Sequence, residues 1–78
     1  MVTTLDIAKT LRKSPIQIYL LVMDAKAEGI NVRKKGRRII WSRDLIKYIE
    51  GRAMRRGWID RRILSEKFLA EKTKAGQN

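Results

Sequence analysis

Hydrophobic positions recur at helical spacing near the start of the chain and predict a short first helix. Thr3 or Thr4 can cap its N-terminus through a side-chain oxygen. Ile7, Ala8 and Leu11 then form one apolar stripe of an amphipathic helix. This helix is expected to end just before the following Ser-Pro step, because the residue before a proline disfavours helical geometry.

The dipeptide Ser14-Pro15 predicts the start of a second helix, since serine is a good N-cap and proline at the first helical position loses no needed donor. This helix, within residues 15–28, is apolar on two opposite faces at roughly 100° per residue. The expected core face carries Ile18, Leu21, Val22 and Ala25, and the other face carries Ile16, Leu20, Met23 and Ala27. The second face is expected to be covered as additional core, by the C-terminal segment, or by another subunit.

Residues 29–43 predict two short strands around a tight turn. Ile30 and Val32 alternate with polar neighbours, which is the period of a strand. Ile39, Ile40 and Trp41 are β-favouring residues that follow the turn. The glycine between the two segments can adopt the positive φ that a hairpin tip needs.

The remainder of the chain predicts two more helices. Ser42 can cap a third helix, whose apolar stripe contains Leu45, Ile46 and Ile49. The glycine at position 51 or at position 57 ends it, and the pattern does not choose between them. Residues from about 60 to 73 have helical composition, and residues 73–78 resemble a frayed tail. The predicted core is Ala8, Leu11, Ile18, Leu21, Val22, Val32, Trp41, Leu45 and Ile49.

These elements predict a mainly α fold with a small β-hairpin and an extra C-terminal helix. The 78 residues suffice for one small domain. No apolar run is long enough to cross a bilayer, and no leader pattern opens the chain, so we expect a cytoplasmic protein without a membrane partner.

The net charge of +11 is unevenly distributed along the chain. Residues 1–28 contain four cations and three acids, whereas residues 29–78 contain fifteen cations and five acids. Such an excess predicts a phosphate-rich partner that meets the second part of the chain.

Two segments concentrate this charge. Within residues 29–43 no acid interrupts six cations: Arg33, Lys34, Lys35, Arg37, Arg38 and Arg43. A solvated surface turn has a similar composition, but the unbroken sign favours binding to a phosphate backbone. Further along, Arg55, Arg56, Arg61 and Arg62 surround Trp58 and Ile59 and are expected to extend the basic surface.

Composition argues against an enzyme. The chain has no cysteine and no histidine, which removes thiolate metal sites and the commonest general base. Its eight acids are scattered singly, and no glycine-rich phosphate loop is present. We therefore expect no catalytic residues, no metal and no cofactor.

The order of motifs over residues 2–50 resembles a known family. The opening Thr3-Thr4-Leu5-Asp6-Ile7-Ala8, followed by Leu11, Ser14-Pro15, Ile18-Tyr19 and Leu21, is similar to small winged-helix excisionases and related MerR-type prophage regulators. The continuation Val32-Arg33, Gly36-Arg37-Arg38, Trp41-Ser42-Arg43-Asp44-Leu45 and Tyr48-Ile49 is similar to the wing and closing helix of that family. Arg12 and Lys13 replace its usual glycine and apolar residue, and Gln17 and Leu20 replace a frequent threonine and arginine.

The resemblance implies a winged helix-turn-helix DNA-binding domain over residues 1–50. Residues 51–78 lie outside the match, and we expect them to form a basic helical extension that packs on this domain or on a neighbouring molecule. The second helix would enter the major groove, and the wing would follow the neighbouring backbone. Ser14, Gln17 and Tyr19 are the candidate contacts of that helix; Gln17 suits adenine and Tyr19 suits a phosphate.

The leading hypothesis is a DNA-binding accessory or regulatory protein of a phage or mobile element, acting in recombination or transcription in a bacterial or phage-infected cell. Double-stranded DNA is the expected partner, with a recombinase or the transcription machinery as a possible second one. Self-association is expected through Ile16, Leu20, Met23, Ile63 and Phe68. The alternatives are a protein-interaction module and a small RNA-binding protein.

Overall fold

The computed structural model describes residues 1–70 of the chain. Its elements are α1 (Thr4–Leu11), α2 (Pro15–Ala27), β1 (Arg33–Lys35), β2 (Arg38–Ile40), α3 (Arg43–Arg55) and α4 (Ile63–Phe68). The expected mainly helical class with a small antiparallel hairpin is confirmed. No helix among these residues has both the length and the apolar content needed to span a bilayer.

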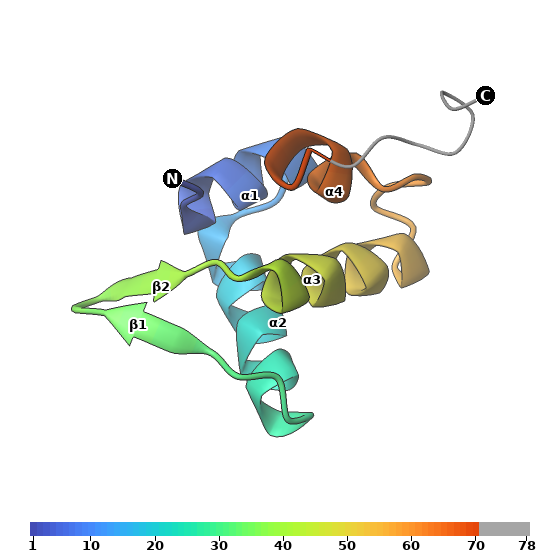
Figure 1. The fold of residues 1–78 in the computed structure, drawn as a ribbon. Helices are drawn as coiled ribbons and strands as arrows, with labels where there is room; N and C mark the ends of the chain where they lie inside the picture. Colours follow the sequence, from blue (N-terminus) through green and yellow to red (C-terminus); the bar gives the residue numbers. More distant parts are fainter. Residues whose placement is uncertain (71–78) are drawn as a thin grey trace.

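Figure 1 shows how the elements are arranged around α3. Helix α2 crosses α3, α1 and α4 lie together on one side of it, and the hairpin projects from its N-terminal end. The Lys67 amino group of α4 donates to Thr10 Oγ1 of α1 over 3.4 Å. The two ends of α3 therefore carry different structures, the hairpin at one and the α3–α4 loop at the other.

Local capping signals account for where the first three helices begin. Thr3 and Asp6 form a reciprocal capping box, with the Asp6 N–H donating to Thr3 Oγ1 over 3.1 Å and the Thr3 N–H donating to Asp6 Oδ2 over 3.0 Å. The backbone hydrogen bond from Thr3 is the main reason that the pKa of Asp6 is lowered. Ser14 and Ser42 cap α2 and α3 in the expected way.

The turn after α1 adopts a left-handed conformation at Arg12, with φ 57° and ψ 42°. The Lys13 N–H donates to the Ala8 carbonyl over 2.9 Å, which closes the end of the helix in the manner of a Schellman motif. Glycine is the residue that takes this conformation at least cost. The arginine found here therefore carries backbone strain that a glycine would avoid.

The core is formed by α1, α2, α3, β2 and α4 together. The buried hydrophobic residues are Ile7, Ala8, Leu11, Ile18, Leu21, Val22, Ala25, Ile39, Trp41, Leu45, Ile46, Ile49, Ala53 and Leu64. Eight of the nine expected core residues are among them. The ninth, Val32, is only partly buried and packs against the cluster from outside.

The hairpin is shifted toward its turn relative to the expected strands. Lys35 pairs with Arg38, and Gly36, with φ 63°, is the first of two turn residues. The first strand begins at Arg33, and Ile30 lies outside it because its N–H caps the end of α2 by donating to the Ala25 carbonyl over 2.9 Å.

The C-terminal part of the described chain is tied to α3 through a buried carboxylate. Helix α3 continues through Gly51, and Gly57, with φ 77°, follows its end. Glu50, 3% exposed, accepts a hydrogen bond from the Ser65 N–H at 2.8 Å and one from its hydroxyl at 2.7 Å. Residue 50, where the sequence suggested a division, lies inside α3. Helix α4 is shorter than the expected segment 60–73, and the expected frayed tail lies outside the described residues.

Candidate nucleic-acid interface

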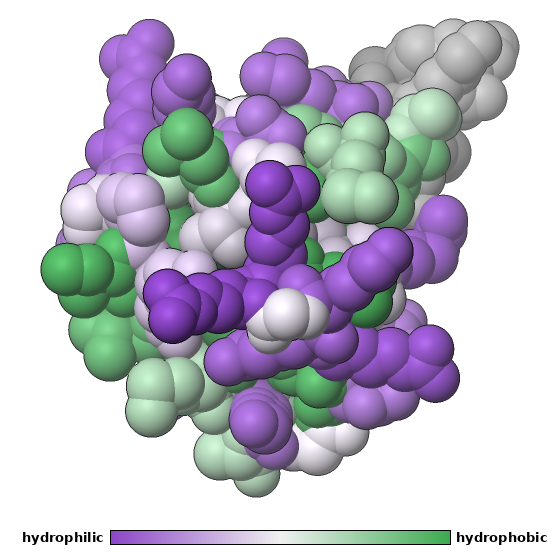
Figure 2. Space-filling view, turned by 90° about the vertical axis from the view of Figure 1, so that its left-hand side faces the viewer, coloured by the Kyte–Doolittle hydropathy of each residue, from purple (hydrophilic) through white to green (hydrophobic). Residues whose placement is uncertain are grey.

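The hairpin presents five exposed cations, namely Arg33, Lys34, Lys35, Arg37 and Arg38. Within residues 1–70, none of these side chains makes an ion pair or a side-chain hydrogen bond. Figure 2 views the molecule from the side on which the hairpin projects and shows hydrophilic side chains crossing the middle of this face. We name these five residues the hairpin cluster; Arg43, also expected here, is exposed at the start of α3.

The pairing of the strands places like charges opposite each other. Lys35 lies directly across from Arg38, and Arg33 lies on the same face, since paired and alternate residues share a side of the sheet. The buried Ile39 belongs to the opposite face of the hairpin. Like charges directly across a strand pair are destabilising. An external anion bound between them would relieve this repulsion.

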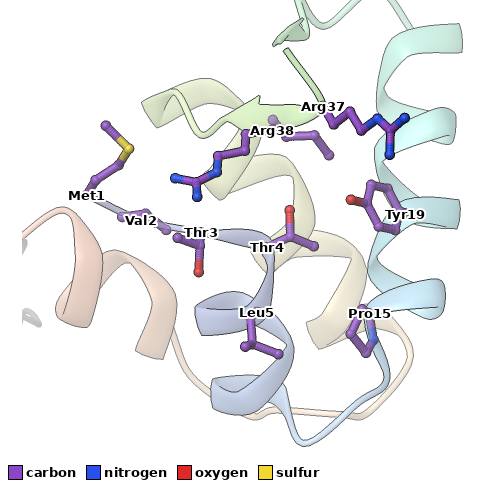
Figure 3. A pocket seen from close by; sticks show the side chains of 10 residues that line it. Met1, Val2, Thr3, Thr4, Leu5, Pro15, Tyr19, Arg37 and Arg38 are labelled. Carbon is purple, nitrogen blue, oxygen red and sulfur yellow. The ribbon is translucent and has the colours of Figure 1, made fainter. Parts of the chain in front are cut away.

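Tyr19 of α2 lies beside the hairpin cluster. A cavity of about 410 Å³ separates the hairpin from the starts of α1 and α2, and its lining includes Tyr19, Arg37 and Arg38. Figure 3 shows Arg37 extending from the hairpin toward Tyr19, while Arg38 extends toward the start of the chain. The structure thus brings together three of the residues that the sequence analysis selected for DNA contact.

The side chains of Ser14 and Gln17 are engaged in the cap of α2. The Gln17 N–H donates to Ser14 Oγ over 3.4 Å, and the Ser14 N–H donates to Gln17 Oε1 over 3.2 Å. Both residues remain exposed, and the Gln17 amide nitrogen can still donate. A bidentate contact from Gln17 to adenine would nevertheless compete with the cap, because such a contact uses the same carbonyl oxygen.

The outward face of α2 is apolar and uncovered by the described residues. Ile16, Leu20 and Met23 are 71%, 57% and 64% exposed, and Ala27 continues the line. We call these four residues the α2 stripe. Figure 2 shows hydrophobic side chains at the edge of the face that carries the hairpin. The stripe offers no hydrogen bond to a base edge.

The described part of the C-terminal segment, up to residue 70, does not cover the α2 stripe. Helix α4 packs on α3 and beside α1 (Figure 1). Phe68 is partly buried against the core, and Ile63 is half-buried at the start of α4. Within residues 1–70, Ile63 and Phe68 therefore lie apart from the α2 stripe of the same chain, so packing of the C-terminal segment on the stripe, one of the expected alternatives, is not observed there.

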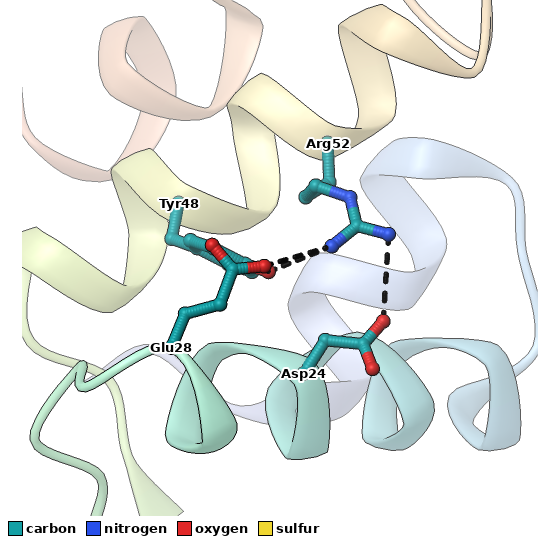
Figure 4. A network of polar contacts seen from close by, with 4 residues as sticks. All are labelled: Asp24, Glu28, Tyr48 and Arg52. Carbon is teal, nitrogen blue, oxygen red and sulfur yellow. Dashed lines mark hydrogen bonds and ion pairs between the residues drawn. The ribbon is translucent and has the colours of Figure 1, made fainter.

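A polar network links α2 and its C-terminal end to α3 and pairs two acids with one arginine (Figure 4). Arg52 donates to the Tyr48 hydroxyl over 2.7 Å and lies 3.4 Å from Asp24 Oδ2 and 3.6 Å from Glu28 Oε2. The Tyr48 hydroxyl in turn donates to Glu28 over 2.8 Å. The hydrogen bond to Tyr48 raises the pKa of Arg52, and burial, followed by the bond to Glu28, raises the pKa of Tyr48.

The network affects anion binding, because the carboxylates of Asp24 and Glu28 are both paired with Arg52. Their repulsion of a nearby phosphate is reduced accordingly. The sequence analysis did not assign this role to Arg52. Acids and a cation on separate helices carry no sequence signal that pairs them.

The other four arginines that were expected to contact DNA lie at the opposite end of α3 from the hairpin. Arg55, Arg56, Arg61 and Arg62 belong to the last turn of α3 and the loop that follows it (Figure 1). Arg61 is partly neutralised by Glu66, at 3.6 Å. The expected basic residues therefore lie at both ends of α3, with Arg43 and Lys47 along the helix between them.

The described residues contain no group of three or more acids, cysteines or histidines that would suit a metal ion. Comparisons of the chain with protein-family models, with curated proteins and with solved structures found no match. Function is therefore inferred from the charges, exposures and geometry of the residues themselves.

Proposed function

We propose that the protein is a DNA-binding accessory or regulatory protein of a phage or mobile element, built as a winged helix-turn-helix in which the hairpin is the wing. The observation that carries the proposal is the hairpin cluster, five exposed cations without an intramolecular partner in residues 1–70. Like charges held opposite each other make the phosphate backbone of a duplex a suitable ligand.

The geometry supports a mode of binding dominated by the backbone. Arg37 and Tyr19 converge from the hairpin and α2, so that both can reach one strand's phosphates. The α2 stripe has no donors or acceptors, so its contribution in a major groove is limited to apolar contact, for example with thymine methyl groups. Binding is accordingly expected to depend strongly on salt and weakly on sequence.

The finer assignment to an excisionase-like or MerR-type regulator is supported by the resemblance of residues 2–50. The order of helix, turn, helix, hairpin and helix over Thr4–Arg55 agrees with it. A recombinase or the transcription machinery in a bacterial or phage-infected cytoplasm would then be the protein partner.

Binding of the wild-type protein to duplex DNA, single-stranded DNA and RNA at several salt concentrations tests this proposal. Five phosphate contacts predict that log K falls with log salt at a slope of about −4.5 on duplex DNA. Fluorescence anisotropy with labelled oligonucleotides measures K for each ligand. A slope near zero, or tighter binding to RNA than to duplex DNA, would contradict the proposal; the second outcome would support RNA binding.

A second candidate function is protein interaction, which the exposed apolar α2 stripe supports. Its members follow one another at spacings of four, three and four residues, which is the spacing of a helix–helix seam. Leaving these side chains in water forgoes about 25 cal/mol per Å² of apolar surface. We propose that a second copy of the chain covers the stripe by pairing α2 with α2.

Light scattering of wild type beside the variant Leu20→Asp tests this pairing. The variant is expected to be monomeric at concentrations where wild type is dimeric, because a carboxylate would lie in the seam. Leu5→Asp on α1 is the matched control, since Leu5 is 52% exposed and lies outside the stripe. A wild type that stays monomeric, free and on DNA, would rule out the pairing.

A further inference from the structure

We propose that the cavity between the hairpin and the starts of α1 and α2 binds a small organic anion with an apolar body, and that this ligand competes with DNA. We call the cavity the hairpin pocket; Thr4, Leu5, Pro15, Tyr19, Arg37 and Arg38 are among the residues that line it. Binding of the anion stands on the pocket alone, whereas the competition rests on the proposed DNA binding.

The size and the lining of the hairpin pocket suit a small molecule. Its volume of about 410 Å³ lies in the range of roughly 300–1,000 Å³ that is usual for ligand sites. The lining is mostly apolar, with Leu5 and Pro15 at the starts of the two helices and Ile39 on the hairpin. The hydrophobic effect therefore favours a ligand with an apolar body.

The charge in the lining has one sign. Arg37 and Arg38 are the charged side chains among the described residues that line the pocket, and neither makes an ion pair within residues 1–70. Figure 3 shows Arg37 reaching toward Tyr19 and Arg38 reaching toward the start of the chain, so that the two guanidinium groups flank the pocket. A carboxylate between them would form charge-assisted hydrogen bonds.

Two hydroxyl groups add donors to the same space. Figure 3 shows the Thr4 oxygen directed toward the hairpin and the Tyr19 oxygen directed toward the middle of the view. Thr4 Oγ1 already accepts a hydrogen bond from Trp41 Nε1 over 3.2 Å, which leaves its O–H as the group to offer to a ligand. The Tyr19 hydroxyl has no partner within residues 1–70. An ionised carboxylate, which only accepts hydrogen bonds, matches these donors.

The position of these groups distinguishes a small ligand from the DNA backbone. A rigid duplex is too wide to enter the hairpin pocket, so its phosphates would meet Arg37 and Arg38 from outside. The Thr4 hydroxyl and the apolar lining would then stay unused. A small carboxylate with an apolar body uses both, and it is the ligand class that fits the whole pocket.

Occupation of the hairpin pocket is expected to oppose DNA binding. A carboxylate held between Arg37 and Arg38 would neutralise part of the charge that attracts the phosphates. Loss of one phosphate contact corresponds to about fivefold in affinity at ~0.15 M salt. The ligand would therefore act as an effector that releases the protein from DNA.

An NMR titration of the free protein with naphthoate tests the pocket. The indole N–H of Trp41 is the reporter, because it donates to Thr4 Oγ1 and its resonance should shift when the Thr4 O–H binds a carboxylate. Naphthoate is expected to give a saturable shift. Acetate lacks the apolar body and naphthamide lacks the charge, so each should bind at least about tenfold more weakly. No saturable shift, or equal affinity for acetate, would overturn the inference.

Two pairs of substitutions on the same hairpin provide the matched comparison. Arg37→Gln with Arg38→Gln removes the charges that line the pocket and should weaken naphthoate binding by at least about tenfold. Arg33→Gln with Lys34→Gln removes the same charge from outside the lining, so naphthoate binding should stay within about threefold of wild type. Equal losses in both pairs would mean attraction by net charge alone and would overturn the pocket.

Fluorescence anisotropy of a labelled duplex in saturating naphthoate tests the competition, with acetate at the same ionic strength as the control. Duplex affinity should fall by at least about fivefold at ~0.15 M salt in naphthoate alone. Unchanged affinity would overturn the competition. A protein that binds duplex but not naphthoate would overturn this inference and leave the proposed function standing. A protein that binds naphthoate but no duplex would support the pocket and overturn both the competition and the proposed function.

Discussion

Replacing Arg37 and Arg38 together with glutamine is expected to weaken binding to duplex DNA of any sequence by at least about tenfold at ~0.15 M salt. Loss of two phosphate contacts corresponds to about 30-fold at this salt, so tenfold is a lower bound. The slope of log K against log salt should become less steep by roughly 1.8. Anisotropy titrations of duplexes of different sequence measure both quantities.

The control for this change is Lys9→Gln with Lys67→Gln, which alters the net charge equally while leaving the hairpin intact. Its affinity is expected to stay within about twofold of wild type, because only distant, screened charges are removed. The two arginines are exposed and outside the core, so folding should be preserved in both proteins. Equal losses of affinity in both variants would mean that net charge, and not the hairpin, determines binding.

Replacing Leu21 with alanine is expected to lower the free energy of unfolding by about 2–5 kcal/mol. Leu21 is 1% exposed and lies on the face of α2 that packs against α3. The loss combines the transfer free energy of the removed atoms with the cavity left behind. A small domain has few other core side chains with which to fill that cavity. Urea unfolding followed by circular dichroism measures the change.

The neighbouring leucine provides a matched control on the same helix. Leu20 is 57% exposed, and alanine there should change the free energy of unfolding by no more than about 0.5 kcal/mol in the monomer. A larger, concentration-dependent effect of Leu20→Ala would instead indicate that the α2 stripe is buried between copies. Similar losses at both positions in a monomer would contradict the assignment of the two faces.

Signals that act over a few residues were enough to predict the elements. The caps of Thr3, Ser14 and Ser42 each depend on a partner three positions away. The core face of α2 follows from helical periodicity, and the hairpin tip follows from one glycine with φ 63°. The structure confirms these features. They could be predicted because their physical causes lie within short segments of the chain.

Contacts between distant segments decided which hairpin residue is buried and which helix face is covered, two points on which the sequence-based expectations were open or wrong. Ile39 of β2 is buried beneath the hairpin, whereas Val32 lies before β1 and is only partly buried against the same cluster. The Glu50–Ser65 hydrogen bonds hold α4 on α3 across fifteen residues, which leaves the α2 stripe uncovered by the described chain.

The candidate site also has features that local sequence determines and features that depend on contacts between distant segments. The number of cations could be read from residues 29–43 and 55–62, and the absence of acids from residues 29–43. Packing between segments decided that Tyr19 lies beside Arg37 and that Lys13 and Arg56 meet at Trp58. It also placed the two groups of cations at opposite ends of α3. Local charge and periodicity are properties of a segment, whereas the distance and direction between segments arise only when their apolar faces are buried against one another.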